Sequence, residues 1–317
     1  MKEVDLIFIN WNSADLLLPA VKTLKESASK VDWQITVIDN GSTDDSCEMI
    51  RRELPEVEIV EVGWNSGFAA AVNIGLKNSK TPYALILNTD VEFRNDVVGI
   101  MLKALKEDPK AVMACPELIR PDNSLQAAVV PEPTLLSELT SRSLTRRFLK
   151  YDKNKTCRVP SVVGPCMAID RQALNALTMQ EPAGLFDERF FFFLEETDFC
   201  RRINQAGGAV LFVPEAKLIH AQGESANKKP VRARVQFYES RYIFFKKHMG
   251  TLSTFILFLG CTFRTAFNAV GQILSGMIMP WKWQKHVNKA TVYLSLLAWH
   301  LKGCPKGHSF DQRFKNK

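Results

Sequence analysis

The sequence predicts an α/β fold, in which a mostly parallel sheet is covered by helices on both faces and is followed by a helical segment. Apolar runs of strand length alternate four times with helical patterns over residues 4–87, and this alternation favours a parallel sheet. Charge divides the chain as well. Residues 228–317 hold 16 Lys and Arg against two acids, whereas residues 1–227 hold 25 against 32. We therefore expect two domains, residues 1–227 and residues 228–317.

The predicted strands follow from short apolar runs, and the predicted helices from apolar residues at helical spacing. In the first helix Leu17, Val21 and Leu24 recur at this spacing after Ser13, which can cap the helix. The strands cover residues 4–9, 34–38, 57–62, 83–87 and 162–169. A helix follows each of the first four strands, and the fourth of these helices covers residues 97–105. One further helix covers residues 171–177, and another begins near Glu195.

Residues 116–160 show no clear periodicity. Four prolines interrupt this stretch, namely Pro116, Pro121, Pro131 and Pro133. A basic group follows them, made of Arg142, Arg146, Arg147 and Lys150. Because proline breaks both helices and strands, we expect a mobile loop over the cleft.

Polar residues stand at the carboxyl end of each of the first four strands. They are Asn10 and Trp11, then Asp39, then Asn65, then Asn88 and Asp90. In open α/β sheets only the carboxyl edge gathers such residues into one ligand-binding crevice. The sequence contains neither a G-x-G-x-x-G motif nor a phosphate-binding G-x-x-x-x-G-K-[ST] motif, so the usual dinucleotide and P-loop interpretations fail.

Asp90 follows the buried strand over residues 83–87 and is the central candidate of this crevice. A carboxylate at that position suits a hard divalent cation, which in turn can hold a diphosphate. The alternative is an Asp that merely caps the following helix, since loops between strands and helices favour Asp as a cap.

Two further candidates lie later in the chain. Glu195 and Glu196 emerge directly from the aromatic run Phe190–Phe193, and burial of a carboxylate raises its pKa and can make it a general base. The alternative is that acids at a helix start only complement the helix dipole. His220 returns towards the site at the end of another apolar run, although a single His is a metal ligand only where other ligands converge.

Seven dispersed cysteines, without paired spacing, indicate a reducing compartment and no zinc site. We expect a cytosolic protein, or at least a cytosolic N-terminal domain. The strongly basic C-terminal segment implies an anionic partner, either phospholipid or nucleic acid.

Seven motifs, taken in order, resemble family 2 glycosyltransferases of the GT-A fold, and in particular the bacterial rhamnosyltransferase-like branch that builds cell-surface polysaccharide. The resemblance covers roughly residues 1–225. The motifs are Val-Ile-Asp39-Asn-Gly-Ser, Asn65-Ser-Gly-Phe, Asn88-Thr-Asp90, Gly164-Pro-Cys-Met, Phe186-Asp-Glu, Glu195-Glu-Thr-Asp and Pro214 with His220.

The resemblance implies a nucleotide pocket. Asp39 would bind the pyrimidine base, with Asn10 and Trp11 packed beside it. Asn65 and Asn73 match a motif that lines this pocket in the family.

The resemblance also implies a metal site and a base. Asp90 is the last acid of the D-x-D motif, which binds Mg²⁺ or Mn²⁺ through the diphosphate, and His220 falls where some members supply a second metal ligand. Glu196 falls where the family places its catalytic base. Two positions depart from the pattern: Asn88 replaces the first acid of D-x-D, which leaves more of the metal binding to Asp90 and His220, and the base is Glu rather than Asp, so Glu195 stays an alternative.

The activity implied is inverting transfer of a sugar from a nucleotide-sugar donor, either dTDP-rhamnose or a UDP-sugar, to a lipid-linked saccharide acceptor. Two rivals stay open. A sugar-nucleotide pyrophosphorylase needs a Gly-rich basic loop, whereas the first strand here ends in Asn10-Trp11-Asn12-Ser13. A non-catalytic module that recruits partners to a membrane is supported only by Asn88.

The C-terminal segment predicts membrane association. Residues 251–263 and 265–281 are uncharged, and Arg264 between them would lie near mid-bilayer if both pieces formed one spanning helix, at a cost of about 2.5–3.5 kcal/mol. We therefore expect a peripheral or monotopic protein on the cytoplasmic face of the plasma membrane, held by apolar burial and by attraction to anionic lipid rather than to nucleic acid. The alternative is that these helices pack on the protein's own core.

Overall fold

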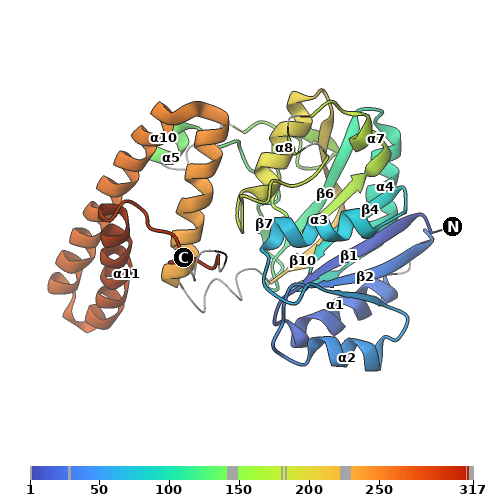
Figure 1. Cartoon of the computed structure of the whole chain (residues 1–317), viewed down its shortest axis with the longest axis horizontal. Coiled ribbons are helices and arrows are strands. Elements are labelled where there is room, and N and C mark those ends of the chain that lie inside the picture. The colour runs from blue at the N-terminus through green and yellow to red at the C-terminus, as the bar shows by residue number, and fades with distance from the viewer. Residues whose placement is uncertain are drawn as a thin grey trace. The chain divides into compact units, whose positions relative to one another are not determined.

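The computed structural model describes residues 2–27, 30–140, 149–179, 181–182, 184–221, 230–311 and 313. The chain divides into two compact units (Figure 1). The first, here called the sheet unit, comprises residues 1–132, 145–190 and 195–222. The second, the helical unit, comprises residues 133–144, 191–194 and 223–317. The helical unit thus includes two short segments, residues 133–144 and 191–194, that lie before the predicted boundary at residue 228.

The sheet unit contains one ten-stranded sheet. Its strands are β1 (Val4–Asn10), β2 (Trp33–Asp39), β3 (Glu58–Glu61), β4 (Tyr83–Asn88), β5 (Val91–Phe93), β6 (Ala111–Ile119), β7 (Leu125–Gln126), β8 (Cys157–Val159), β9 (Cys166–Asp170) and β10 (Ala209–His220). Its helices are α1 (Ala14–Glu26), α2 (Ser46–Glu53), α3 (Phe68–Asn78), α4 (Val97–Glu107), α7 (Arg171–Ala176) and α8 (Glu195–Gln205). The predicted strands and helices are all present.

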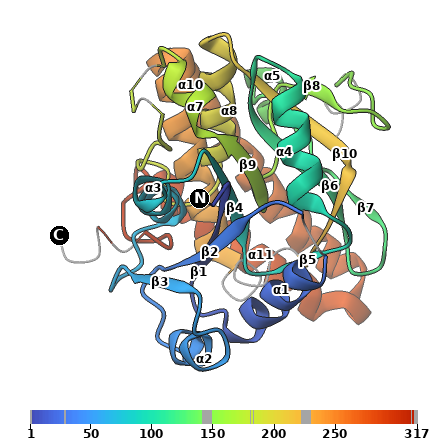
Figure 2. The ribbon, with the colours of Figure 1, turned by 90° about the vertical axis from the view of Figure 1, so that its right-hand side faces the viewer.

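The strand order is β3-β2-β1-β4-β9-β6-β10-β5, with β7 paired to β6 and β8 paired to β10. The chain runs outward from β1 to β3 and then returns to β4, on the other side of β1, so the order reverses between β1 and β4. Figure 2 shows α1 and α4 on one side of the sheet and α3 and α7 on the other. Ligands bind in open α/β sheets at such a reversal, outside the carboxyl ends of the strands.

The sheet is mixed rather than uniformly parallel. β1, β2, β3 and β4 pair in parallel, but β9 is antiparallel to both β4 and β6, and β5 is antiparallel to β10. The apolar run that predicts β9 carries no information on direction, because a strand buried on both faces looks the same either way. All seven residues of β1 are buried, as expected for a central strand.

The prediction of one loop over residues 116–160 is wrong. This stretch contains the end of β6, the strands β7 and β8, and the short helix α5 (Leu135–Leu139). Pro116 lies within β6 because the pairing with β10 shifts register there, between Val213 and Lys217, and a bulge tolerates a residue without an N–H donor. Arg142, Arg146 and Arg147 lie outside the described residues.

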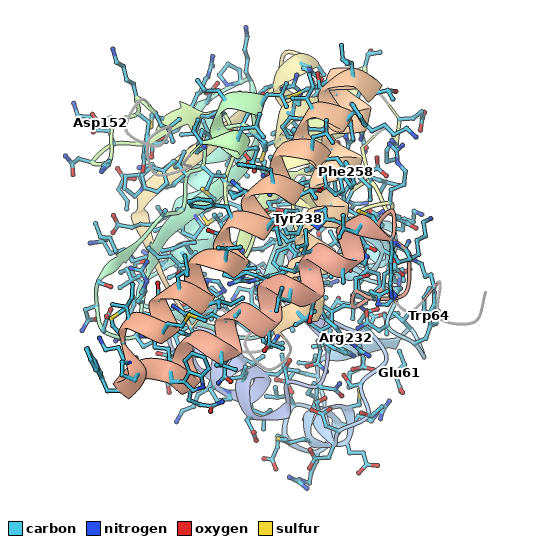
Figure 3. The ribbon with its side chains drawn as sticks, turned by 90° about the vertical axis from the view of Figure 1, so that its left-hand side faces the viewer. Glu61, Trp64, Asp152, Arg232, Tyr238 and Phe258 are labelled. Atoms are coloured by element: carbon cyan, nitrogen blue, oxygen red, sulfur yellow. The ribbon has the colours of Figure 1, made fainter. Side chains whose placement is uncertain are left out.

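The helical unit consists of α5, α10 (Pro230–Ile278), the short helix η1 (Pro280–Lys282) and α11 (Trp283–Leu301). α10 is two helices joined at Gly250, whose φ of 81° breaks the helical backbone. Val235 of α10 packs against Leu296 and Trp299 of α11 in a small apolar core, and α10 and α11 lie side by side (Figure 3). α5 is tied to α10 by an ion pair between the buried side chains of Glu138 and Arg241.

Candidate active site

Asn10 and Asp39 meet at the carboxyl ends of two neighbouring strands. They are opposite each other in the β1–β2 register, and Nδ2 of Asn10 donates to Oδ1 of Asp39 at 2.9 Å. The same Asn10 amide reaches Oγ of Ser42 and Oγ of Ser46, while Oδ2 of Asp39 accepts from the backbone N–H of Ser42 at 3.1 Å. Asn10 therefore orients the Asp39 carboxylate. Trp11, the next residue, is half-buried at the same edge.

Asn65 lies on a second loop that is bound to the loop after β2. Asn40 donates to Oδ1 of Asn65 at 3.2 Å, and the same oxygen accepts from the backbone N–H of Gly67. Gly41 permits this close approach: its φ is +76°, and an added Cβ would lie 2.4 Å from the backbone carbon of Trp64. Asn10 and Asp39, both predicted to bind the nucleotide, thus lie at the ends of adjacent strands. Asn65, the third predicted residue, lies on a loop that is hydrogen-bonded to the loop after β2.

Asp90 and His220 lie together, as the metal-site prediction requires. His220 is opposite Val91 in the antiparallel β10–β5 pairing, so Asp90 comes directly beside it. Nε2 of His220 lies 3.5 Å from Oδ2 of Asp90, and both side chains are largely buried. Asn88 is half-buried at the end of β4, where its backbone N–H donates to the carbonyl of Pro165.

Gln126 also belongs to this group, although no sequence pattern points to it. It lies on β7, is buried, and its side-chain amide lies 3.1 Å (Nε2) and 3.3 Å (Oε1) from Nδ1 of His220. An acceptor on Nδ1 fixes the tautomer in which Nε2 carries a lone pair. Gln126 also lines a cavity of about 420 Å³ beside β7 and β10, with Glu117, Tyr151, Lys153 and Phe212.

The donor set fits a divalent cation that is shared with a substrate. Within the described ranges, no group of three or more His, Cys, Asp and Glu side chains is placed to hold a metal ion. Asp90 and His220 nevertheless offer one oxygen and one nitrogen ligand. Cations of the Mg²⁺ type are commonly bound by one or two carboxylates together with phosphate oxygens and water, so the rest of the coordination shell would come from a diphosphate.

Glu195 and Glu196 begin α8 and carry strongly perturbed pKa values. Burial raises the pKa of Glu196 to about 7. Burial, and then the charge of Glu196, raise the pKa of Glu195 well above its ordinary value. One carboxylate oxygen of each is buried without a hydrogen-bond partner among the described residues. With a pKa of about 7, Glu196 is partly ionised at neutral pH and can accept a proton, which favours Glu196 as the base.

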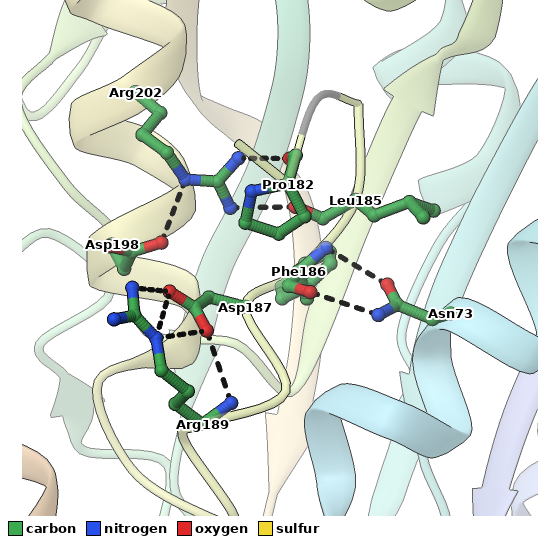
Figure 4. Close-up of polar contacts among 8 residues, drawn as sticks. All are labelled: Asn73, Pro182, Leu185, Phe186, Asp187, Arg189, Asp198 and Arg202. Atoms are coloured by element: carbon green, nitrogen blue, oxygen red, sulfur yellow. Dashed lines mark hydrogen bonds and ion pairs between the residues drawn. The ribbon is translucent and has the colours of Figure 1, made fainter. Parts of the chain in front are cut away.

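Asn73 lies in a different environment from the other predicted nucleotide residues. Both ends of its amide bond the backbone of Phe186, at 2.9 Å each (Figure 4). Its Nδ2 also reaches the carboxylate of Glu188. These hydrogen bonds occupy the amide, and through them Asn73 holds the backbone of the segment after residue 184 in place. Its role in nucleotide binding stays a prediction.

The same segment is held from α8. Arg202, which is fully buried, donates to the carbonyls of Pro182 and Leu185 and pairs with Asp198 at 2.8 Å (Figure 4). Asp187 forms a bidentate pair with Arg189 in the same segment. Asp198, the acid that follows Glu196 in α8, is therefore structural: it neutralises a buried arginine, since a buried charge needs a partner.

The reversed sheet has the architecture of the GT-A class, and the Asp90–His220 pair and the buried carboxylates at the start of α8 belong to its candidate site. The chain belongs to glycosyl transferase family 2, whose family model matches residues 5–178, more than half of its length. The predicted family and fold class are thereby confirmed.

Two curated relatives are rhamnosyltransferases. The chain is 24% identical over 238 residues to the N-acetylglucosaminyl-diphospho-decaprenol L-rhamnosyltransferase of Mycobacterium tuberculosis, covering 68% of this chain and 76% of the relative. It is 23% identical over 216 residues to the dTDP-rhamnosyl transferase RfbF of Shigella flexneri, covering 66% of this chain and 68% of the relative. The protein is thus a rhamnosyltransferase-like member of the family.

Two solved structures share the fold. The mannosyltransferase PcManGT of Pyrobaculum calidifontis, in complex with GDP-Man and Mn²⁺, superposes with a TM-score of 0.56 at 15% identity, over 96% of this chain and 88% of that chain. GalNAc-T7 with UDP, GalNAc and Mn²⁺ superposes with a TM-score of 0.53 at 18% identity, over 69% and 43% respectively. At these identities the likeness concerns the fold alone.

Proposed function

We propose that this protein is an inverting, metal-dependent glycosyltransferase that acts on a lipid-linked saccharide in cell-surface polysaccharide synthesis. The observation that carries the proposal is the approach of His220 to Asp90 at 3.5 Å, at the sheet edge where such folds bind ligands. The names of the two relatives support dTDP-rhamnose as the donor, with a UDP-sugar as the next choice.

The chain's own residues account for the roles that the reaction needs. Asp39, oriented by Asn10, faces the base of the nucleotide, with Trp11 and Asn65 on the adjoining loops. Asp90 and His220 would hold a divalent cation, and Asn88 stands two residues before Asp90 in the chain. A divalent cation bound there supplies charge neutralisation for the diphosphate leaving group.

Glu196 removes the proton from the acceptor hydroxyl as its oxygen attacks the anomeric carbon. The new C–O bond forms on the face opposite the departing diphosphate, so the configuration inverts, and the nucleoside diphosphate leaves with the bonding electrons. Such a base must be ionised before attack and must lie within hydrogen-bonding reach of the hydroxyl. A pKa of about 7 for Glu196 meets the first condition at neutral pH.

The helical unit supports a membrane location through an exposed apolar stripe on the second half of α10. Its members recur every three or four residues, which places them on one face of the helix. They are Leu252, Phe255, Ile256, Leu259, Phe263, Phe267, Val270, Ile273, Leu274, Met277 and Ile278, all between 37% and 75% exposed. An exposed apolar patch of this extent marks an interaction site.

α10 is long and apolar enough to cross a membrane by length and composition alone, and only 22% of its most apolar window is buried. This low burial supports a membrane location over packing of the helix on the protein's own core. Arg264, expected near mid-bilayer in a spanning helix, instead turns away from the stripe, since its Nη1 donates to the carbonyl of Glu138 at 2.7 Å.

The charges at the ends of the stripe favour a lipid surface. Lys246 and Lys247 precede it, and Lys282 follows it beside Trp281, which is 75% exposed. Tryptophan and lysine commonly mark the membrane–water interface. We infer a helix that lies in the cytoplasmic leaflet of the plasma membrane, where an acceptor carried on a polyprenyl diphosphate would be presented.

The test is sugar transfer by the full-length protein from dTDP-rhamnose, and in parallel from UDP-sugars, to a polyprenyl-diphosphate-linked saccharide in the presence of Mn²⁺. We expect transfer that is lost in Asp90→Ala while the thermal unfolding midpoint is kept. Wild-type turnover by Asp90→Ala at saturating Mn²⁺ would contradict the metal role. The absence of donor binding, hydrolysis and transfer with every nucleotide sugar would favour the rival, a non-catalytic module that recruits partners to the membrane.

A further inference from the structure

Two consecutive bulky residues directly before α8 have left-handed backbone conformations. Phe193 has a φ of 72° and Leu194 a φ of 66°. Residues with a Cβ are unfavourable in this region, and bulky residues are true outliers there. Such a conformation persists only where the surrounding structure holds it in place, and it occurs most often at functional sites.

Side chains of α10 hold this loop within the helical unit. Oγ of Ser240 donates to the carbonyl of Phe192 at 2.7 Å, and Ser240 is fully buried. The ring of Phe237 meets the ring of Phe193 edge-on, with a centroid separation of 5.5 Å. Phe237 and Ser240 are three residues apart on a helix and therefore lie on the same face.

A third contact comes from the end of the described chain. The guanidinium of Arg313 lies over the ring of Phe191, 5.5 Å from its centroid, and Asp311 orients this guanidinium through a hydrogen bond of 2.7 Å to Nη2. Three successive phenylalanines of the loop, from 191 to 193, are thus each held by a different residue of the helical unit.

The chain leads from this loop straight into the carboxylates that the proposed reaction uses. Leu194 is followed by Glu195 and Glu196, the first two residues of α8. The left-handed turn at residues 193 and 194 sets the direction in which α8 begins, and therefore where both carboxylates point. We propose that Ser240 is a positioning residue for Glu195 and Glu196, acting through the left-handed loop; this inference rests on the proposed function.

The physical consequence of losing the Ser240 hydroxyl follows from its partner. The carbonyl of Phe192 would lose the hydrogen bond from Ser240, and the loop would relax towards the more favourable right-handed region and admit water to the start of α8. Three of the described groups lie next to Glu196. Glu195 and the thiol of Cys200 lie on its own helix, and Gly164, which is uncharged, packs against its Cβ. The pair of Arg201 with Glu132 lies further along α8. None of these groups replaces the lost restraint.

The experiment compares Ser240→Ala with Ser275→Ala in the full-length protein. Ser275 is a matched control, because its hydroxyl bonds the carbonyl of Gly271 within the same helix. For Ser240→Ala we expect kcat to fall about tenfold, KM for the donor to stay within about twofold, and the acid limb of the kcat–pH profile to move to lower pH as water lowers the pKa of Glu196. Ser240→Thr, which keeps a hydroxyl, should restore the profile, and Ser275→Ala should match wild type.

An unshifted pH profile in Ser240→Ala, or an equal shift in Ser275→Ala, would overturn the inference. A second measurement separates this outcome from a failure of the proposed function. Hydrogen exchange of the amides of residues 190–197 needs no turnover, and we expect it to be faster in Ser240→Ala than in wild type or Ser275→Ala. Unchanged exchange would overturn the positioning role even in a protein that proved active.

Discussion

Asn73 holds the backbone of Phe186 at both polar atoms: its Nδ2 donates to the carbonyl and its Oδ1 accepts from the N–H, each at 2.9 Å. Phe186 is fully buried, so neither backbone group has water as an alternative partner. This arrangement joins α3 to the segment that leads towards α8, and it gives Asn73 a structural task whether or not it also contacts a nucleotide.

We predict that Asn73→Ala lowers the free energy of unfolding by about 1–3 kcal/mol, because it leaves buried backbone groups without partners. Denaturant unfolding measures the loss. Asn78→Ala is the matched control, since Asn78 is exposed at the end of the same helix, and we expect a change within about 0.5 kcal/mol. A large loss of donor affinity without loss of stability would show instead that Asn73 serves mainly as a nucleotide contact.

A second prediction concerns Gln126, whose amide reaches Nδ1 of His220. If Nε2 of His220 binds a cation, Nδ1 carries the proton and needs an acceptor. Gln126→Leu should therefore weaken Mn²⁺ binding about 10–100-fold, the usual effect of losing such an outer partner. Gln126→Glu keeps an acceptor and should bind Mn²⁺ nearly as wild type does.

Paramagnetic resonance of free Mn²⁺, recorded with nucleoside diphosphate present, measures this affinity without turnover. The thermal unfolding midpoint of both variants serves as the control for folding. Equal Mn²⁺ affinity in wild type and Gln126→Leu would show that His220 is not a ligand, or that Gln126 does not orient it.

The sequence was sufficient for the strands and helices of the sheet unit, because each carries its own local periodicity. It was not sufficient for the contacts that make the site. His220 meets Asp90 only because β5 pairs with β10 in an antiparallel register, and no pattern near either residue specifies that pairing. Gln126 joins them through β7, a two-residue strand, which is too short to show alternation.

The prediction of a loop over residues 116–160, which was based on its prolines, was wrong for a physical reason. Pro116 indicates a break in a strand, and the strand does lose its regular pairing there, but the bulge keeps β6 going on both sides of it. The hydrogen bond from Ser240 to the loop before α8 could not be predicted from the sequence either, because one hydroxyl joins two segments that lie far apart in the chain. Local pattern determines the elements; tertiary pairing determines the site.

A third prediction separates Glu196 from Glu195. Glu196→Gln should lower turnover about 10²–10⁴-fold, as the loss of a general base does, while donor binding is kept because the amide preserves the shape. Glu195, whose pKa is raised well above its ordinary value by burial and by the charge of Glu196, should be less sensitive to the same change. An inactive Glu195→Gln together with an active Glu196→Gln would move the base by one residue.

The same variant has a signature in stability. Burial raises the folded-state pKa of Glu196 from 4.5 to about 7, so its ionisation costs stability as pH rises through this window, where the unfolded chain gives up its proton first. Glu196→Gln stays neutral throughout. Relative to wild type, the thermal unfolding midpoint of Glu196→Gln should therefore rise as the pH increases from about 4.5 to 7. Above pH 7 the difference between the two midpoints should stay constant. A constant difference across all pH values would mean that Glu196 is not buried as an acid.

The last prediction concerns the exposed stripe of α10 and decides where the enzyme works. Phe263 and Phe267 are 75% and 69% exposed, so replacing both by Glu should change the stability of the protein little. If the stripe enters a bilayer, the double variant loses the burial of two aromatic side chains, each worth about 1.5–3 kcal/mol, and adds two charges that anionic lipid repels. Binding to vesicles that contain anionic lipid, measured by sedimentation of the full-length protein, should then fall at least about tenfold.

Leu301→Glu is the control: Leu301 is 74% exposed at the end of α11 but lies outside the stripe, and we expect near-normal binding. If the full-length protein does not bind such vesicles at low salt, or if the double variant binds them as wild type does, lipid is not the partner of this face. A dimer that the double variant converts to a monomer would then identify a second copy of the chain as the partner.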